Sequence, residues 1–223
     1  MRIFATVKEQ VYESLKNDIC NGRLEPGKWL QEQEIATQLN VSRSPVREAF
    51  RMLAGDGLVS EIPNKGVFVR KFTQRDIEEI FAVRQMMESY AILHSNDSRT
   101  SEHEEALCRY LEKYRAGTFP DDRDSLMQLN TYVHDLIMQM CGNSLLQELY
   151  QKVQSMLQPF QIYTFNQEKT FLREHAEIIE ALLDGKIEEA NALNRTHLAL
   201  AQKDVERYIS ELSGAEDGGK STV

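Results

Sequence analysis

The chain has 223 residues, of which 41% are hydrophobic and 27% charged, and its formal net charge is −9. Apolar and charged stretches alternate along it, which excludes an intrinsically disordered chain, and no apolar stretch approaches the roughly 20 residues that span a bilayer. Its three cysteines, Cys20, Cys108 and Cys141, form no CxxC pair, so we expect reduced thiols in a cytoplasmic protein without a membrane partner.

A first helix is predicted over residues 7–21. Apolar residues recur there every four positions, at Val7, Val11, Leu15 and Ile19. Residues with this spacing lie on one side of a helix and form a single apolar stripe. This stripe gives the first helix one face to bury.

A short helix over residues 32–39 and a third helix follow, separated by a tight turn. We expect the third helix to begin with a serine hydroxyl as its cap, supplied by either Ser42 or Ser44. Pro45 falls in the first turn of that helix, where its missing N–H leaves no hydrogen bond unmade.

Two short β-strands complete the N-terminal part of the chain. They are predicted over residues 58–62 and 67–69, and the intervening Pro63-Asn64-Lys65-Gly66 is a hairpin turn with a basic tip. Three helices followed by a hairpin within residues 1–72 are the outline of a winged helix-turn-helix domain.

Beyond residue 72 the pattern is helical only. Pro159 should kink one of these helices or divide it in two. The predicted fold class is mostly α: a winged helix-turn-helix over residues 1–72, an all-α antiparallel helical bundle over 73–212, and a disordered, Gly-rich tail over 213–223. The helices of the bundle are expected over residues 73–94, 102–116, 123–141, 144–164, 171–183 and 187–212.

The start of the third helix is the most specific part of the sequence. Because the apolar stripe of this helix faces the core, Arg43, Ser44 and Arg47 lie on its opposite face, near the N-terminus. In helix-turn-helix proteins this end enters the major groove of DNA. An arginine there can bind guanine through two hydrogen bonds, which contribute about 1–3 kcal/mol of discrimination. Serine hydroxyls and free N–H groups suit phosphate oxygens.

The charge distribution also points to DNA contact by the N-terminal part. Residues 1–72 carry 11 basic and 9 acidic residues, whereas the remainder carries 15 basic and 26 acidic ones. A basic region on an otherwise acidic chain is expected to be the one that meets a polyanion. Lys65 and Gly66 at the hairpin tip can reach the neighbouring groove or backbone, because glycine lets the main chain approach closely.

At these residues the sequence resembles the GntR family of bacterial transcription regulators. The string VSRSPVREAFRMLAGDGLV, followed by a wing, looks like that family's recognition helix and strand, and the helical remainder resembles the FadR subfamily with its ligand-binding FCD domain. The resemblance implies base or phosphate contacts for Arg43, Ser44 and Arg47, and a phosphate contact for Ser42. It also implies a wing contact for Lys65 with Gly66.

One position departs from the family pattern in the helix before the turn. The family often has an arginine there, and this sequence has Gln33. The substitution removes one charge–phosphate contact and leaves the role of Gln33 in DNA binding open.

Three histidines of the helical part face its interior from three different helices. They are His134, His175 and His197, each on the apolar stripe of its own helix. A single inward histidine is more often a core residue with a hydrogen-bond partner than a ligand. Three of them could instead bind one metal ion, which would satisfy one nitrogen of each ring.

The FCD resemblance implies a divalent metal bound by an Asp-x-x-x-His pair and two later histidines. The histidines match, but Asn130 occupies the position of the aspartate, so the site loses one negative charge. Three alternatives remain: a metal with Asn130 as a weak or outer ligand, an effector pocket without metal, or a hydrogen-bonded histidine network. Three imidazoles accept zinc, nickel or manganese, and we expect a small carboxylate effector to complete the coordination.

Arg84 is a charged residue on the apolar stripe of the helix predicted over 73–94, and Glu88 follows one turn later. Two interpretations are open. Arg84 either pairs with Glu88 inside the bundle or at a dimer contact, or it binds the carboxylate of an effector, for which the guanidinium fork is well suited.

These features favour a regulator without enzymatic activity, a homodimer that places two winged helices on a pseudo-palindromic DNA operator. An effector would bias the relative position of the DNA-binding domains. A metal-dependent hydrolase is the first alternative, although we find no acidic residue clearly placed as its general base. An architectural protein whose helical part only dimerises is the second. Neither the effector, the operator nor the choice between repression and activation follows from the sequence.

Overall fold

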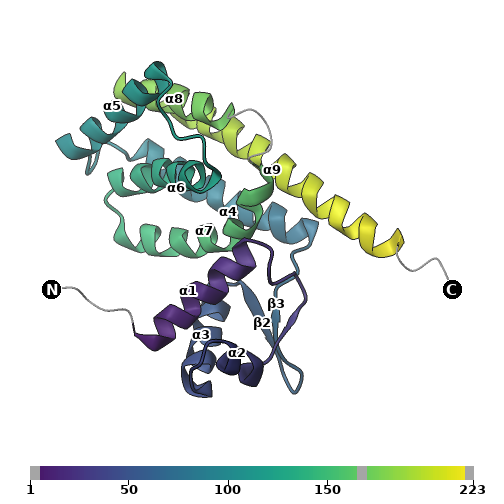
Figure 1. The fold of residues 1–223 in the computed structure, drawn as a ribbon. Coiled ribbons are helices and arrows are strands. Elements are labelled where there is room, and N and C mark those ends of the chain that lie inside the picture. Colours follow the sequence, from purple (N-terminus) through teal and green to yellow (C-terminus); the bar gives the residue numbers. More distant parts are fainter. Residues whose placement is uncertain (1–5, 165–169, 219–223) are drawn as a thin grey trace. The chain divides into compact units, whose positions relative to one another are not determined.

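The computed structural model describes residues 6–164 and 170–218. Two compact units make up the chain (Figure 1). Residues 1–73 together with 152–162 form the N-terminal unit, and residues 74–151 together with 163–223 form the helical unit. Among the described helices, none combines the length and the apolar character needed to cross a membrane.

The N-terminal unit is a winged helix-turn-helix, which confirms the predicted fold class. Its three helices are α1 (Val7–Cys20), α2 (Glu32–Gln38) and α3 (Arg43–Gly55). The strands β2 (Val59–Ile62) and β3 (Gly66–Val69) form the hairpin, and a two-residue strand β1 (Trp29–Leu30) pairs with the other edge of β3. All pairings are antiparallel, in the order β1-β3-β2. The sequence pattern did not predict β1, because two residues are too few to show an alternation.

The core of this unit is built from the predicted stripes. Val46, Phe50 and Leu53 of α3 are buried against the apolar face of α1. Ser42 occupies the N-cap position of α3 with an extended backbone, but its side chain makes no capping hydrogen bond. The predicted serine cap is therefore wrong in its hydrogen bond: α3 already begins at Arg43, so Ser44 lies inside the helix, and both serines are exposed.

Within its described residues, the helical unit contains five whole helices and parts of a sixth. α4 (Gln74–Leu93) lies beside α9 (Ile187–Gly218) and also contacts α6 (Arg123–Met140), and α8 (Thr170–Leu183) packs between α9 and α5 (Ser101–Ala116) (Figure 1). The apolar core of the unit is formed by side chains from all of these helices. Inward-facing side chains of α4, α6, α8 and α9 therefore come close to one another.

The last part of the chain differs from the predictions in two places. Residues 144–164 form one helix, α7 (Ser144–Thr164), with Pro159 inside it, so of the two alternatives given for this proline, a kink or a division, the division is wrong. α9 extends to Gly218 and includes the first residues of the segment predicted as a disordered tail. Residues 219–223 lie outside the part of the chain that the structure describes.

Candidate DNA interface and histidine site

The exposed face of α3 carries the residues predicted to contact DNA. Burial of the opposite face fixes the rotation of the helix and leaves Arg43, Ser44 and Arg47 exposed. The Arg43 and Arg47 side chains retain 58% and 54% of their accessible surface, so both guanidinium groups are available to a partner. Ser42, immediately before the helix, is exposed as well.

Both arginines are bound by one carboxylate, that of Glu32 at the start of α2. Arg47 donates from Nε to Oε1 and from Nη2 to Oε2, each at 2.8 Å, and Arg43 donates from Nη2 to Oε2 at 3.1 Å. The hydrogen bond from Arg47 holds the pKa of Glu32 below its usual value. In the DNA-free protein Arg47 is therefore a surface charge paired with a nearby acid.

The wing has a structural reason for its glycine. Gly66 has a φ of 109°, and a Cβ atom added to it would lie 2.6 Å from Nε1 of Trp29. The indole of Trp29, on the neighbouring strand β1, thus occupies the space beside Gly66. Close approach to this ring explains the glycine without any DNA. Lys65 at the tip is exposed.

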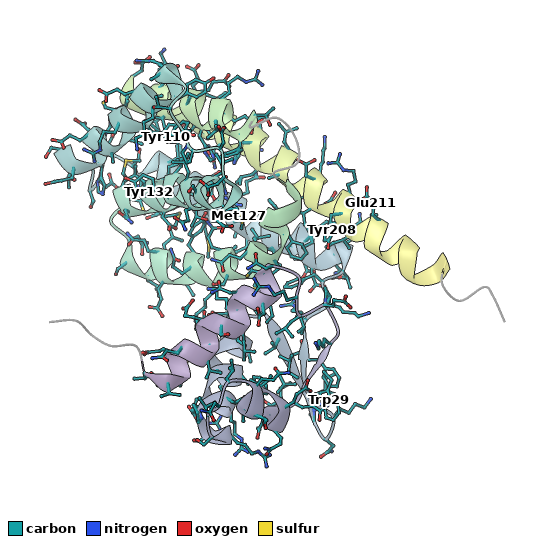
Figure 2. All side chains as sticks on the ribbon, viewed as in Figure 1. Trp29, Tyr110, Met127, Tyr132, Tyr208 and Glu211 are labelled. Atoms are coloured by element: carbon teal, nitrogen blue, oxygen red, sulfur yellow. The ribbon has the colours of Figure 1, made fainter. Side chains whose placement is uncertain are left out.

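A shallow cavity of about 300 Å³ brings several predicted contact residues together. Gln33, Arg43 and Gly66 line it, along with Trp29, whose half-exposed side chain is labelled in Figure 2. The recognition helix, the helix before it and the wing therefore share one surface. Trp29 and Glu32 also line this cavity, and the sequence pattern did not predict them as members of this surface.

In the helical unit, the three predicted histidines converge. His134 from α6, His175 from α8 and His197 from α9 are each at least 95% buried. Nε2 of His134 lies 3.3 Å from Nε2 of His175 and 3.3 Å from Nε2 of His197. One ligand atom from each ring falls within 4.8 Å of the others. Two imidazole nitrogens on one zinc ion, with bonds of about 2.0–2.1 Å at a tetrahedral angle, are separated by about 3.3 Å.

Two carboxylates contact the Nδ1 atoms of two of the histidines. Oε2 of Glu88 lies 3.1 Å from Nδ1 of His134, and Oε2 of Glu174 lies 2.7 Å from Nδ1 of His197. A carboxylate only accepts hydrogen bonds, so each Nδ1 carries a proton and donates it, and each Nε2 is directed toward the other histidines. This arrangement orients an imidazole toward a metal ion and fixes its tautomer.

The geometry of the cluster tests whether a metal fits. Burial lowers the pKa of His134 to about 4 and, with the two neighbouring histidines, holds the pKa of His175 well below its usual value, so both rings are neutral. Nε2 of His175 and Nε2 of His197 both point at Nε2 of His134, at 3.3 Å each. A neutral His134 that donates from Nδ1 has a single lone pair at Nε2, whereas a divalent cation can bind all three nitrogens. The residues present fit a metal ion.

Glu88 also binds Arg84, the charged residue on the apolar stripe. Arg84 donates from Nε to Oε1 of Glu88 at 2.7 Å, and both side chains are buried. Tyr150 donates to the same oxygen at 2.6 Å, and the amide nitrogen of Asn194 donates to Oε2 at 2.9 Å. Burial alone would raise the pKa of Glu88, but Arg84 and His134 hold it well below its usual value. The predicted pair inside the bundle is thus present.

Three buried atoms of this network and of the histidine cluster have no hydrogen-bond partner among the described residues. They are Nη2 of Arg84, a donor, Oδ1 of Asn194, an acceptor, and Nδ1 of His175. Buried polar atoms are rarely left unpaired in folded proteins, and each one costs free energy. Unpaired atoms next to a convergent histidine cluster are typical of a ligand site.

The remaining predicted residues lie at the margin of the site or away from it. Asn130 is half-buried, one helical turn before His134 on α6. His103 belongs to the capping box of α5, where its Nδ1 accepts a hydrogen bond from the Thr100 N–H. His94 stacks on Tyr90 and contacts Asp97. Neither His94 nor His103 joins the cluster.

A winged helix with exposed arginines, in one chain with a helical unit that buries three convergent histidines, defines a DNA-binding regulator with a ligand-binding domain. Residues 7–69 match the family described as bacterial regulatory proteins of the gntR family, and residues 79–200 match the FCD domain. The chain therefore belongs to the GntR family, in its FadR-like subfamily with an FCD domain. It is a DNA-binding transcription regulator with an effector-binding domain.

Several relatives support this assignment. The chain is 31% identical to the uncharacterized HTH-type transcriptional regulator YdhC of Bacillus subtilis, over 77% of this chain and 78% of that protein. It is 27% identical to the HTH-type transcriptional repressor RspR of Escherichia coli, over 79% and 78% of the two chains. A crystal structure of a GntR transcriptional regulator from Rhodococcus sp. RHA1 has a TM-score of 0.70 and 29% identity, covering 89% of this chain and 96% of the other.

Proposed function

We propose that this chain is a one-component regulator in which His134, His175 and His197 hold a divalent metal ion. The buried polar groups around them bind a small carboxylate effector, which changes the affinity for a double-stranded operator. The observation that carries the proposal is the convergence of three Nε2 atoms, two of them fixed by carboxylates on the far side of their rings. When bound, the metal supplies positive charge and open coordination positions for effector oxygens. Zinc, nickel and manganese all suit three imidazoles.

The choice of an organic acid as effector rests on charge and on the unpaired atoms. Arg84 neutralises Glu88, and Asn130 stands where an aspartate would bring a negative charge. A metal-loaded site is therefore net positive in its interior and favours an anion. Nη2 of Arg84 can donate to a carboxylate, and Oδ1 of Asn194 can accept from a hydroxyl. A hydroxy acid would pair both atoms.

On DNA, we propose that Arg43, Ser44 and Arg47 enter the major groove, while Ser42 and Gln33 meet the backbone and Lys65 with Gly66 follows from the wing. The cavity that Gln33, Arg43 and Gly66 share supports their action on one duplex. Residues 1–72 would then be the DNA-binding domain and residues 73–212 the effector and dimerisation domain. Because the target is DNA, the protein would act in the cytoplasm.

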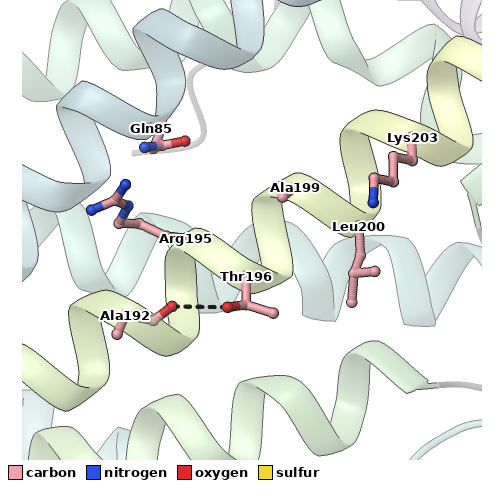
Figure 3. Close-up of a pocket in the computed structure, with 7 residues that line it drawn as sticks. All are labelled: Gln85, Ala192, Arg195, Thr196, Ala199, Leu200 and Lys203. Carbon is pink, nitrogen blue, oxygen red and sulfur yellow. Dashed lines mark hydrogen bonds between the residues drawn. The ribbon is translucent and has the colours of Figure 1, made fainter.

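We further propose a homodimer formed through the outer face of α4. Opposite its buried side, α4 carries four exposed apolar side chains spaced three and four residues apart: Val83, Met86, Tyr90 and Leu93. A helix that is apolar on two opposite faces is usually covered on both. Beside α4, a groove of about 490 Å³ along α9 runs past Gln85, Arg195 and Leu200 (Figure 3) and could receive side chains of a second copy.

The dimer is tested by placing a charge on this face. Met86→Glu puts a carboxylate on a side chain that is 68% exposed, and light scattering after gel filtration should then give the monomer mass. Leu145→Glu on α7, at a side chain that is 64% exposed, is the matched control and should remain dimeric. A dimer that persists in Met86→Glu places the interface elsewhere.

A metal-dependent hydrolase is less well supported. Glu88 and Glu174 contact the histidines, and both do so at Nδ1 atoms on the side away from the cluster centre. There they orient the rings and cannot take a proton from a water between the histidines. An architectural dimer would leave the histidine site without a purpose.

Metal content tests the proposal. The untagged protein, purified without chelator, should contain close to one metal ion per chain by mass spectrometry, and His175→Ala should contain almost none. His103→Ala, which removes a histidine outside the cluster, should retain the wild-type content. A metal content that is the same in wild type and His175→Ala would contradict the site.

A further inference from the structure

Glu32 is placed unlike an ordinary surface acid. It is half-buried in the first turn of α2, and its side chain retains 22% of its accessible surface. From there its two oxygens bind both arginines of the recognition helix, which follow it by 11 and 15 residues. One carboxylate thus fixes two long side chains on the surface that meets DNA.

The hydrogen bonds to Arg47 use a particular edge of its guanidinium. Nε and one N–H of Nη2 point to Glu32, at 2.8 Å each. An arginine has five N–H groups in a rigid plane, so both N–H groups of Nη1 and the second one of Nη2 remain free. These free groups form a second fork, which matches the O6 and N7 acceptors of guanine.

Holding the arginine has a consequence for selectivity. A free guanidinium on a flexible side chain can turn to any phosphate oxygen, and such contacts carry no sequence information. A guanidinium held by a carboxylate on one edge presents only the other edge. Its negative partner also weakens the attraction to phosphates, which lie on the outside of the groove.

We propose that Glu32 is a specificity-determining positioning residue, which holds Arg47 and Arg43 so that Arg47 selects guanine over phosphate. This inference rests on the proposed DNA interface. It assigns Glu32 an effect on the ratio of specific to non-specific binding rather than on affinity in general. Glu32 acts through Arg47 and need not touch DNA itself.

The test compares two fluorescent duplexes by anisotropy at fixed salt. One carries the site that the wild-type protein enriches from a random library, and the other is a scrambled duplex of the same composition. Glu32→Gln should lower the ratio of the two affinities about tenfold, within the range set by one bidentate arginine–guanine contact. It should also make the binding of the scrambled duplex more salt-dependent, because freed arginines contact phosphates.

Glu34→Gln is the matched control. It removes the same charge two residues along the same helix. The Glu34 side chain is exposed, and among the described residues it accepts a hydrogen bond from Gln38. Glu34→Gln should change the affinity for both duplexes by the same factor. A ratio that is unchanged, or raised, in Glu32→Gln would overturn the inference. Thermal unfolding of each variant shows whether it is folded, and Glu32→Asp, which keeps the charge but shortens the reach, replaces Glu32→Gln if that variant does not fold.

A double-mutant cycle with Arg47→Lys separates the inference from the function it rests on. If Glu32 acts through Arg47, Glu32→Gln should have no further effect on the ratio in the Arg47→Lys background. If Arg47→Lys by itself leaves binding of the selected duplex unchanged, the proposed DNA interface fails. If Arg47→Lys weakens that binding while Glu32→Gln leaves the ratio intact, only the role of Glu32 fails.

Discussion

Each unit of this protein contains a glutamate that binds an arginine at nearly the same distance, in opposite surroundings. Glu32 and Arg47 lie 2.8 Å apart with 22% and 54% of their side-chain surface exposed. Glu88 and Arg84 lie 2.7 Å apart with 0% and 6% exposed. The first pair faces the surface proposed to meet DNA, and the second lies behind the histidine site.

Burial decides what each pair can do. An exposed pair contributes little to stability, so it can position a side chain without supporting the fold. A buried pair has lost its water, so removal of one member leaves an uncompensated charge. The chain therefore uses the same chemistry to position an exposed arginine and to hold His134 in place.

The largest expected effect is on the stability of the buried pair. Glu88→Gln should lower the free energy of unfolding by about 3–5 kcal/mol, because Arg84 remains buried without its counter-charge. Urea denaturation followed by circular dichroism measures this. Glu32→Gln in the same assay should unfold close to wild type. Equal losses of stability in the two variants would contradict the claim that burial makes the Glu88–Arg84 pair matter more for stability than the Glu32–Arg47 pair.

Tyr150→Phe tests the buried pair further, because it removes one neutral hydrogen-bond donor to Glu88 and keeps the aromatic ring. The hydroxyl donates to Oε1 of Glu88 at 2.6 Å inside the bundle. Since hydrogen bonds to charged groups contribute about 1.5–3 kcal/mol, the free energy of unfolding should fall by that amount. Tyr114→Phe, at a partly buried tyrosine of the same core, is the control and should lose less. Wild-type stability in Tyr150→Phe would mean that the Tyr150 hydroxyl does not contribute to the support of Glu88.

Arg47→Lys tests the exposed pair on DNA. Lysine keeps the positive charge but has no fork, so binding of the selected duplex should weaken roughly ten- to a hundredfold. Fluorescence anisotropy measures the affinity. Arg51→Lys changes a residue one turn later on α3 that is paired with Glu48, and should have a much smaller effect. Equal effects of both substitutions would contradict base contact by Arg47.

The smallest expected effect is a change in the fluorescence emission of Trp29. Trp29 is the single tryptophan of the chain, it is 50% exposed, and it lines the cavity shared with Arg43 and Gln33. Binding of the selected duplex should exclude water from its ring and shift its emission to shorter wavelength. Emission that stays unchanged at saturation would place DNA away from this cavity.

The N-terminal unit was largely predictable because its information is local. The apolar stripe of α3 fixes which face is buried, so the exposure of Arg43 and Arg47 follows from spacing alone. Glu32 was missed as their partner, because no local pattern links residues on different helices. Gly66 was singled out as a DNA contact, which stays a prediction. Its contact with Trp29 depends on strand β1, whose two residues are too few to show a pattern.

The histidine site was only half predictable. The inward orientation of His134, His175 and His197 follows from helical periodicity, and the structure brings them together. Arg84 binds Glu88 from one turn away, and spacing indicated it. The other residues that bind Glu88 lie 46, 62 and 106 positions away, and such distances leave no periodic trace. Among them, Asn194 lies one turn before His197 on the same face, so spacing could have indicated it.

Operator affinity with and without candidate effectors tests most directly whether the histidine site controls DNA binding. The affinity of wild type and His175→Ala for the selected duplex is measured by anisotropy across a panel of small hydroxy acids and dicarboxylates. At least one acid should shift the wild-type affinity by about 5- to 150-fold, the usual range of allosteric coupling, and leave His175→Ala unchanged. The same shift in both proteins, or no shift with any acid, would contradict the account.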